Sequence, residues 1–237
     1  MPAPRPLAFL AHVLLPPLCV HCAGPLPNSR PGVCRWCRAT LRPPGPGCLR
    51  CALPRPGNPT ECDRCRTWPP GIEAVAATRY AGAAESIVQA LKYQGWSHLA
   101  DLCAASMAAA LGNRGGSLDA LVPVPLHRAR RRERGFNQSS LLAAALGARL
   151  GIPVVDALTR RRSTRSQVGL GRAARGRNVE GAFVATAGAR PGSVLGLVDD
   201  VATSGATLAA AGTTLLASGA ASVVAVTFAL ALDGPPR

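Results

Sequence analysis

One stretch of the sequence, residues 194–208, combines two carboxylates with a small hydroxyl-rich turn. An apolar run long enough for a buried strand leads to Asp199 and Asp200, and the turn Thr203–Thr207 comes just before a helix-forming segment that begins at Leu208. Because amides at a helix start and nearby hydroxyls bind anions, the turn predicts a phosphate site. The carboxylates would repel a phosphate but suit vicinal hydroxyls or a metal ion, so the expected ligand is a ribose 5-phosphate. A buried strand followed by an acidic helix cap is the alternative.

The order of these residues resembles the phosphoribosyl diphosphate signature of type I phosphoribosyltransferases, in which two acids precede a Thr/Ser-Thr/Ser-Gly-x-Thr turn. The resemblance implies that Asp199 and Asp200 hold the ribose hydroxyls, directly or through Mg²⁺. Chemistry at C1 would then depend on positioning and electrostatic stabilisation. The five turn residues implied to hold the 5-phosphate are Thr203, Ser204, Gly205, Ala206 and Thr207.

Eight of the nine cysteines form four CxxC knuckles, spaced CxxC-x11-CxxC and then CxxC-x10-CxxC. Two thiolates three residues apart bind one tetrahedral Zn²⁺, and a second knuckle closes the site, which leaves no position for a substrate. We therefore predict a double zinc ribbon with two structural sites, although crossed pairing, occupancy of a single site and disulfides are alternatives. The ninth cysteine, Cys103, is expected in the core. The predicted ligands are Cys19, Cys22, Cys34 and Cys37 in one site and Cys48, Cys51, Cys62 and Cys65 in the other.

The helix-breaking cluster Trp68–Gly71 is the best domain boundary. It separates the double zinc ribbon, residues 1–68, from a domain of residues 72–237 in which strands alternate with helices. This alternation predicts an α/β fold with a parallel sheet that binds ligands at the carboxyl ends of its strands, and the resemblance implies the type I phosphoribosyltransferase fold. The expected strands are 73–80, 118–124, 153–158, 181–184, 194–198 and 222–232, and the expected helices are 86–93, 99–111, 139–150 and 208–217, with a basic loop at 160–177.

Three further segments carry a more specific resemblance. They are VPVPLHR at residues 122–128, RGFNQ at 134–138 and SQVGL at 166–170. Together with the cysteine knuckles, the segment LKY around Lys92 and the acidic signature, they resemble the ComF family of competence-associated phosphoribosyltransferase-like proteins along essentially the whole chain. This resemblance implies a role in DNA uptake during natural transformation, and single-stranded DNA and a competence helicase are the alternative partners considered.

The ComF resemblance also implies roles for single residues. His127 and Arg128 would lie where relatives bind pyrophosphate, Arg165 and Gln167 would close over the diphosphate as catalytic residues with the acid pair, and Lys92 would contact the substrate. Relatives often carry Lys near the position of Arg165. Arg retains the charge but does not serve as a proton donor.

Positive charge is concentrated in one part of the chain. The formal net charge is +15, and residues 128–180 contain thirteen arginines against three acidic residues. This suits a diphosphate or a longer polyanion such as single-stranded DNA, whereas a solvated basic surface from a GC-rich genome is the plainer alternative. We expect a phosphoribosyltransferase that binds phosphoribosyl diphosphate and Mg²⁺. The alternatives are a non-catalytic factor that binds single-stranded DNA or a helicase and has a ligand-sensing pocket, and a structural adaptor with a vestigial pocket.

No segment reaches the roughly 20 apolar residues that a membrane-spanning helix needs. The apolar segment Leu7–Leu15 is short and bracketed by prolines, and no signal-peptide cleavage site follows it. We therefore expect no membrane span and a cytoplasmic protein.

Overall fold

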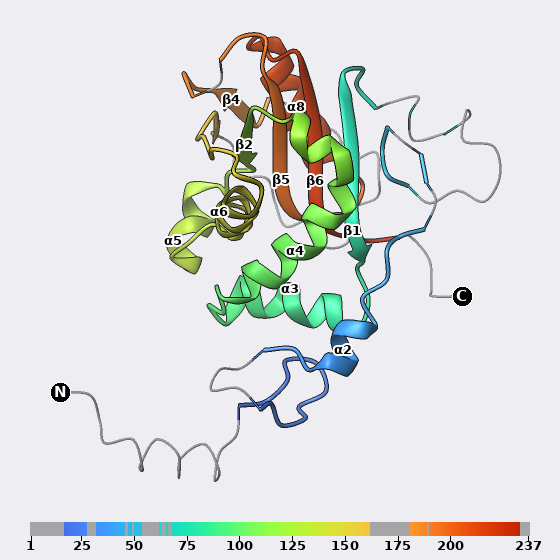
Figure 1. Ribbon diagram of the computed structural model, residues 1–237. Coiled ribbons are helices and arrows are strands. Elements are labelled where there is room, and N and C mark those ends of the chain that lie inside the picture. The colour runs from blue at the N-terminus through green and yellow to red at the C-terminus, as the bar shows by residue number, and fades with distance from the viewer. Residues whose placement is uncertain are drawn as a thin grey trace.

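Four parallel strands form the central sheet in the order β1-β6-β5-β2 (Figure 1). The computed structural model describes residues 17–27, 32–45, 47–48, 50–53, 62, 65, 68–161, 181–188 and 190–232. A parallel bridge between Leu121 and Val154 continues the sheet beyond β2. The predicted α/β class with a parallel sheet is confirmed. The four strands are β1 (Ile72–Arg79), β2 (Ala120–Pro123), β5 (Val194–Ala202) and β6 (Ser222–Leu230).

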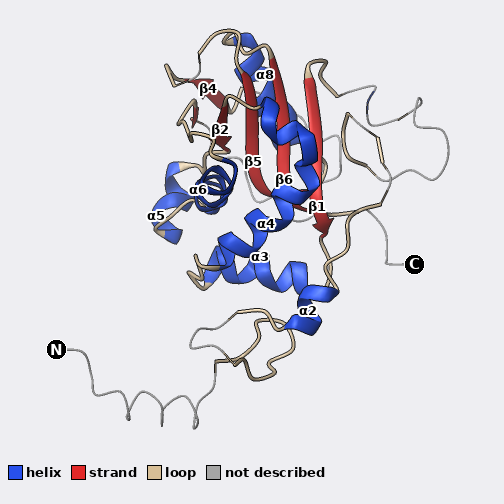
Figure 2. Cartoon of the chain, viewed as in Figure 1, coloured by secondary structure: helices blue, strands red, loops and turns tan. Residues whose placement is uncertain are grey.

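Helices cover both faces of the sheet (Figure 2). Three helices and the side chain of Phe228 form the first core, on one face, and α8 with Ala225 belongs to the second core, on the other face. Because successive residues of a strand point to opposite faces, β6 is buried on both sides. The helices of the first core are α3 (Ala83–Tyr93), α4 (Leu99–Leu111) and α6 (Gln138–Leu150), and α8 spans Ala206–Ala217. A 3-10 helix, η2 (Gly112–Ser117), follows α4.

The two cysteine-rich segments pack on opposite faces of the sheet. Cys19 and Cys37, the latter on the short helix α2 (Arg35–Ala39), belong to the first core with α3 and α4. Cys51 and Trp68 belong to the second core with α8. The described parts of residues 17–68 therefore contribute to both cores, and their independence as a separate domain stays a prediction.

The chain passes between these two faces along the outer edge of β1. The carbonyl oxygen of Arg42 accepts hydrogen bonds from the backbone N–H of Arg79 and from the hydroxyl of Thr78, each over 2.9 Å. These bonds satisfy polar groups at the edge of the sheet, where no other strand of the described residues pairs. Among the described residues, no helix is both long and apolar enough to cross a membrane.

One helix was not expected from the sequence. α5 (Arg128–Arg134) occupies a segment expected only to be polar and basic, and it buries none of its residues. Its ends explain why it forms: His127 Nδ1 accepts a hydrogen bond from the backbone N–H of Ala129, and Gly135 ends the helix in the left-handed conformation. Good helix formers with caps at both ends can form a short helix without an apolar face.

A small antiparallel ribbon stands apart from the main sheet. It pairs β3 (Leu158–Arg160) with β4 (Phe183–Ala185). The strand expected at residues 153–158 is therefore wrong for most of its length, since only Val154 bridges to the parallel sheet and pairing in the ribbon starts at Leu158. Residues 162–180, most of the expected basic loop, lie outside the described residues.

Candidate functional site

The chain leaves two neighbouring strands toward opposite faces of the sheet. After β2 it continues to α5 and to α6, which packs in the first core, whereas after β5 it enters α8 in the second core. Such a divergence opens a crevice at the carboxyl ends of the two strands, and ligands of α/β proteins bind in this crevice. The acid pair and the hydroxyl-rich turn follow β5 to this point.

The acid pair lies inside β5 rather than after it. We expected the strand to end before Asp199, and this is wrong because β5 continues to Ala202. The reason is the neighbouring strand: β6 runs alongside and pairs Leu230 with Ala202. The sheet therefore fixes the backbone of both acids.

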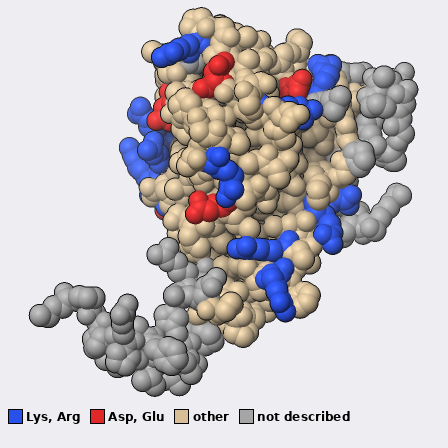
Figure 3. Space-filling model, in the orientation of Figure 1, with Lys and Arg blue, Asp and Glu red and all other residues tan. Residues whose placement is uncertain are grey.

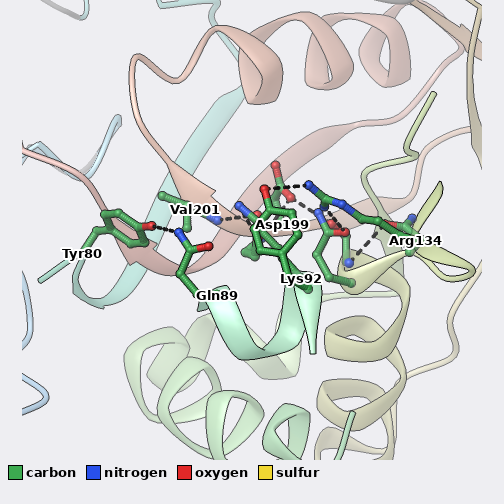
Figure 4. Close-up of polar contacts among 11 residues, drawn as sticks. Tyr80, Gln89, Lys92, Arg134, Asp199 and Val201 are labelled. Carbon is green, nitrogen blue, oxygen red and sulfur yellow. Dashed lines mark hydrogen bonds and ion pairs between the residues drawn. The ribbon is translucent and has the colours of Figure 1, made fainter. Parts of the chain in front are cut away.

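Each acid is held by a different helix (Figure 4). The Ser139 hydroxyl, in α6, donates a hydrogen bond to Asp199 Oδ1 over 2.8 Å. Lys92, near the end of α3, places its Nζ 2.8 Å from Asp200 Oδ2. The acids also accept hydrogen bonds from the backbone N–H groups that follow them, at 2.9 Å from Asp200 and from Val201. The only lysine of the chain is thus part of the acid site.

Burial of this group changes its protonation. Burial raises the pKa of Asp199 to about 7, the charge of Asp200 adds to the shift, and the hydrogen bond from Ser139 opposes it. Burial lowers the pKa of Lys92, but the two carboxylates more than offset this and raise that pKa above its usual value. Asp199 is therefore close to half protonated at neutral pH, and a bound cation would favour its ionised form.

The turn after β5 leads directly into the N-terminus of α8. Thr203, Ser204 and Thr207 are partly exposed, whereas Gly205 is buried. Gly205 is the N-cap of α8, with a left-handed φ of 76°, and has no side chain to satisfy the first amides of the helix. The N–H of Ala206 donates a hydrogen bond to Ser204 Oγ over 3.4 Å. Amides at an uncapped helix start are the groups that hold a phosphate in other proteins.

A cavity of about 890 Å³ opens beyond the end of β2, between α5 and the β3–β4 ribbon. Arg160 links this cavity to the acid pair: burial lowers the pKa of Arg160, and the charge of Asp199 opposes that shift. Four arginines face the single acid Asp156 in the lining, and basic side chains gather over α5 on this side of the molecule (Figure 3). The cavity can therefore hold an anion larger than one phosphate. The lining arginines are Arg128, Arg131, Arg160 and Arg161.

Comparison with known proteins identifies the family. The chain is 34% identical over 216 residues to the DNA utilization protein YhgH of Escherichia coli K12, which covers 88% of this chain and 95% of that protein. It is 35% identical over 216 residues to the protein of the same name from Salmonella typhimurium, with the same coverage. It is 30% identical over 199 residues to the Competence protein F of Haemophilus influenzae, over 80% of this chain and 86% of that protein. The chain belongs to the ComF family. A scan against protein-family models gives no match.

In this ComF protein the eight knuckle cysteines form two groups of four. All four sulfurs of a group lie within 4.8 Å of one another, with 3.8 Å between Cys22 and Cys34 and 3.3 Å between Cys48 and Cys65. Zn–S bonds of about 2.3 Å in a tetrahedron place sulfurs roughly 3.8 Å apart, so both groups can hold Zn²⁺. The cysteines group in the sequential order predicted from the sequence, and their pairing as zinc sites stays a prediction. The first cluster is Cys19, Cys22, Cys34 and Cys37, and the second cluster is Cys48, Cys51, Cys62 and Cys65.

In each cluster of this ComF protein, one buried thiol has a lowered pKa. Burial raises the pKa of Cys19, but hydrogen bonds from the backbone of Cys22 and Cys34 more than offset this and bring it to about 6. Burial likewise raises the pKa of Cys48, and hydrogen bonds from the backbone of Cys51 and the thiol of Cys65 more than offset this and bring it to about 7. Burial raises the pKa of Cys37, Cys51 and Cys65, so the thiols of one cluster differ widely in acidity. The thiolate is the form that binds zinc, and metal binding to all four thiols would therefore release protons.

The residues predicted for the ComF site are distributed over several places. Lys92 and the acid pair form one contact group. Arg128 lines the arginine-rich cavity, whereas the ring of His127 caps α5 and does not line it. The two residues of the basic loop, Arg165 and Gln167, lie outside the described residues.

Sequence reasoning missed the contacts of Ser139 and a cluster at the ends of α3 and α5. The Arg134 guanidinium lies 4.9 Å from the centroid of the Tyr93 ring, with its nitrogens 3.3 Å from the Tyr93 hydroxyl and 3.2 Å from Gln138 Oε1. This cluster ties α3, α5 and α6 together next to Lys92. A signal was available, because the ComF-like segments LKY and RGFNQ contain these residues.

Proposed function

We propose that this ComF protein binds phosphoribosyl diphosphate with Mg²⁺ at the carboxyl end of β5 and acts as a phosphoribosyltransferase. The observation that carries the proposal is the position of the acid pair and the Thr203–Thr207 turn. They lie consecutively along β5 and the start of α8, at the crevice where neighbouring strands diverge. In the proposal Asp199 and Asp200 receive the ribose hydroxyls, the turn receives the 5-phosphate, and Arg128 receives the diphosphate.

The residues present fit a hard cation such as Mg²⁺. Asp199 supplies carboxylate oxygens, and burial and the charge of Asp200 raise its pKa to about 7, so a cation would stabilise its ionised form. When bound, Mg²⁺ would offset the charge of the diphosphate leaving group. Lys92 already balances the charge of Asp200 and orients that carboxylate. In the same proposal the two cysteine clusters hold structural zinc and take no part in catalysis.

The test is a thermal-shift series with phosphoribosyl diphosphate and Mg²⁺. A ligand at 100 times its Kd stabilises the folded state by about 2.7 kcal/mol, which raises the melting temperature by roughly 5–11 °C in a chain of this size. The double variant Asp199→Asn/Asp200→Asn should show no shift. Asp101→Asn, at an exposed acid of α4, should keep the full shift. If the ligands did not raise the melting temperature of the wild-type protein, the proposal would be wrong.

We further propose that the protein acts in the use or uptake of DNA, as the names of its relatives suggest for those proteins. The specific support is the arginine-rich face: α5 has no buried residue and carries five arginines, four of them exposed, and the neighbouring cavity adds Arg160 and Arg161. Clustered cations are what the backbone of single-stranded DNA requires. The alternative is that a helicase binds the same arginine-rich face.

Single-stranded DNA binding through this face should depend steeply on salt. Neutralising two phosphate contacts with Arg131→Ala/Arg161→Ala should reduce the slope of log K against log salt by about 1.4. The matched control is Arg149→Ala/Arg190→Ala, which removes the same charge from exposed positions outside the cavity lining. Fluorescence anisotropy of a labelled oligonucleotide at several salt concentrations measures the slope. A flat salt dependence in the wild-type protein would exclude the DNA-binding role.

A further inference from the structure

Trp68 supports the phosphate-binding turn from the side of the second core. A Cβ atom placed on Gly205 would lie 2.6 Å from Cζ3 of the Trp68 ring and 3.3 Å from its Cη2. No side chain fits in this space, so the indole ring is in direct contact with the turn backbone. The ring is buried, with 5% of the residue exposed, and packs in the same core as Leu208 in the first turn of α8. Gly205 therefore serves two needs, its left-handed φ and the contact with Trp68.

Both knuckles of the second cluster hold Trp68 in place. Trp68 follows Cys65 by three residues, and its backbone N–H donates a hydrogen bond to the Cys65 carbonyl over 3.4 Å. Arg50, between the two cysteines of the other knuckle, donates to the Trp68 carbonyl over 3.1 Å. The indole Nε1–H donates to the Ile72 carbonyl over 2.8 Å, at the start of β1. The second cluster and β1 thus fix both the backbone and the ring.

In the described part of the chain, the first cluster contacts neither Trp68 nor the phosphate-binding turn. It packs in the first core, on the other face of the sheet, where His21 Nδ1 lies 3.0 Å from the Ser86 hydroxyl near the start of α3. Lys92 lies at the opposite end of α3. The two clusters are alike in ligands but differ in what they support.

We propose that Trp68 is a positioning residue through which the second cluster, when it holds its metal, fixes the phosphate-binding turn in its ligand-binding conformation. This inference rests on the proposed function. Loss of metal from the second cluster releases the Cys65 and Arg50 contacts and frees the ring to move away from Gly205. The turn then loses its support, and affinity for the 5-phosphate falls. Loss of metal from the first cluster leaves this support intact.

The experiment measures the Kd of phosphoribosyl diphosphate with Mg²⁺ by calorimetry. We expect Trp68→Ala to raise the Kd roughly tenfold or more, because a binding group held loosely by its supporting residues loses affinity. Trp68→Phe keeps a ring against Gly205 and should recover most of the affinity. The control is Trp36→Ala, since Trp36 is 70% exposed on α2 and should leave the Kd within about twofold.

A matched pair of cysteine variants tests the role of the metal. Cys65→Ser and Cys22→Ser should each lower the zinc content from two ions to one, but only Cys65→Ser should weaken binding, by roughly the factor found for Trp68→Ala. Ligand should also change tryptophan fluorescence in Trp36→Phe/Trp96→Phe, in which Trp68 is the only tryptophan, and the change should be smaller in Trp68→Phe than in the wild-type protein. This spectroscopic readout separates a contact with the turn from a general loss of stability.

The possible outcomes are distinct. Wild-type affinity in folded Trp68→Ala would overturn the inference, and so would equal weakening by Cys22→Ser and Cys65→Ser. If Cys65→Ser does not fold, the Trp68 variants and their fluorescence decide alone. Absence of binding by the wild-type protein would instead overturn the proposed function, and this inference with it.

Discussion

Removal of metal from both cysteine clusters is expected to lower the melting temperature by about 10–20 °C. The clusters join segments that contribute to both cores, and their sulfurs crowd within 4.8 Å of one another. Structural zinc contributes about 10 kcal/mol or more in zinc-finger peptides, and half of that, about 5 kcal/mol, corresponds to this shift in a chain of this size. Calorimetry with a chelator, with metal content measured by mass spectrometry, would show the change.

Readdition of Zn²⁺ should restore the original melting temperature. Cys103→Ala provides a control, because Cys103 is fully buried in the first core, outside both clusters. That variant should keep two zinc ions and lose only the small packing contribution of one thiol. Metal-free protein with an unchanged melting temperature would contradict a structural role for the clusters.

Asp199→Asn is expected to stabilise the ligand-free protein above pH 7. The pKa of Asp199 is about 7 in the folded protein, against about 3.9 in an unfolded chain. Between these values the folded state holds a proton that the unfolded state has released, so stability falls as pH rises and the loss is complete above pH 7. The difference between the folded and unfolded pKa of Asp199 lowers the free energy of unfolding by at most about 4 kcal/mol. We expect the free energy of unfolding of Asp199→Asn to exceed that of the wild type by about 2 kcal/mol at pH 8. Asparagine does not titrate, and its Oδ1 can still accept the hydrogen bonds from the Ser139 hydroxyl and the Asp200 backbone N–H.

Urea unfolding at pH 5, 6.5 and 8 measures this effect. The gain from Asp199→Asn should shrink as pH falls, because the wild-type carboxyl then becomes protonated in the folded protein. Asp101→Asn removes an equal charge from an exposed site and should change stability by less than about 1 kcal/mol at every pH. If Asp199→Asn were less stable than the wild type at pH 8, the ionised carboxylate of the partly buried Asp199 would not be destabilising the folded protein. A variant that is more stable and has lost ligand binding would mark Asp199 as a residue retained for function.

Local patterns predicted much of this structure. CxxC spacing was sufficient for both clusters because each knuckle fixes two ligands within one turn. The helical spacing of apolar residues located most of α3, and continuous apolar runs located β6 and the strand before the acid pair, because strands covered on both faces have no polar side. The order of acids, turn and helix likewise predicted the junction of β5 with α8.

Most of the features that the sequence did not predict depend on contacts between distant segments. β5 continues through the acids only because β6 pairs with it as far as Leu230. The bond from Ser139 to Asp199 joins residues 60 positions apart, and the packing of Trp68 on Gly205 joins residues still further apart. α5 lacks an apolar stripe and was missed for that reason, although Gly135 was a visible end signal. Apart from α5, none of these features leaves a pattern within a single segment of the sequence.

The position of β6 has a consequence for how the protein is made. β6 is the last strand of the described sheet in chain order, yet it lies between β1 and β5 and pairs with both. During synthesis, neither core can form around β1 and the cysteine-rich residues 17–68 until β6 has been made. Until then the thiols and the inner edge of β1 are exposed to oxidation and to unwanted pairing. Folding should therefore be a late, concerted event, and truncation before Ser222 should leave an aggregating chain rather than a smaller folded domain.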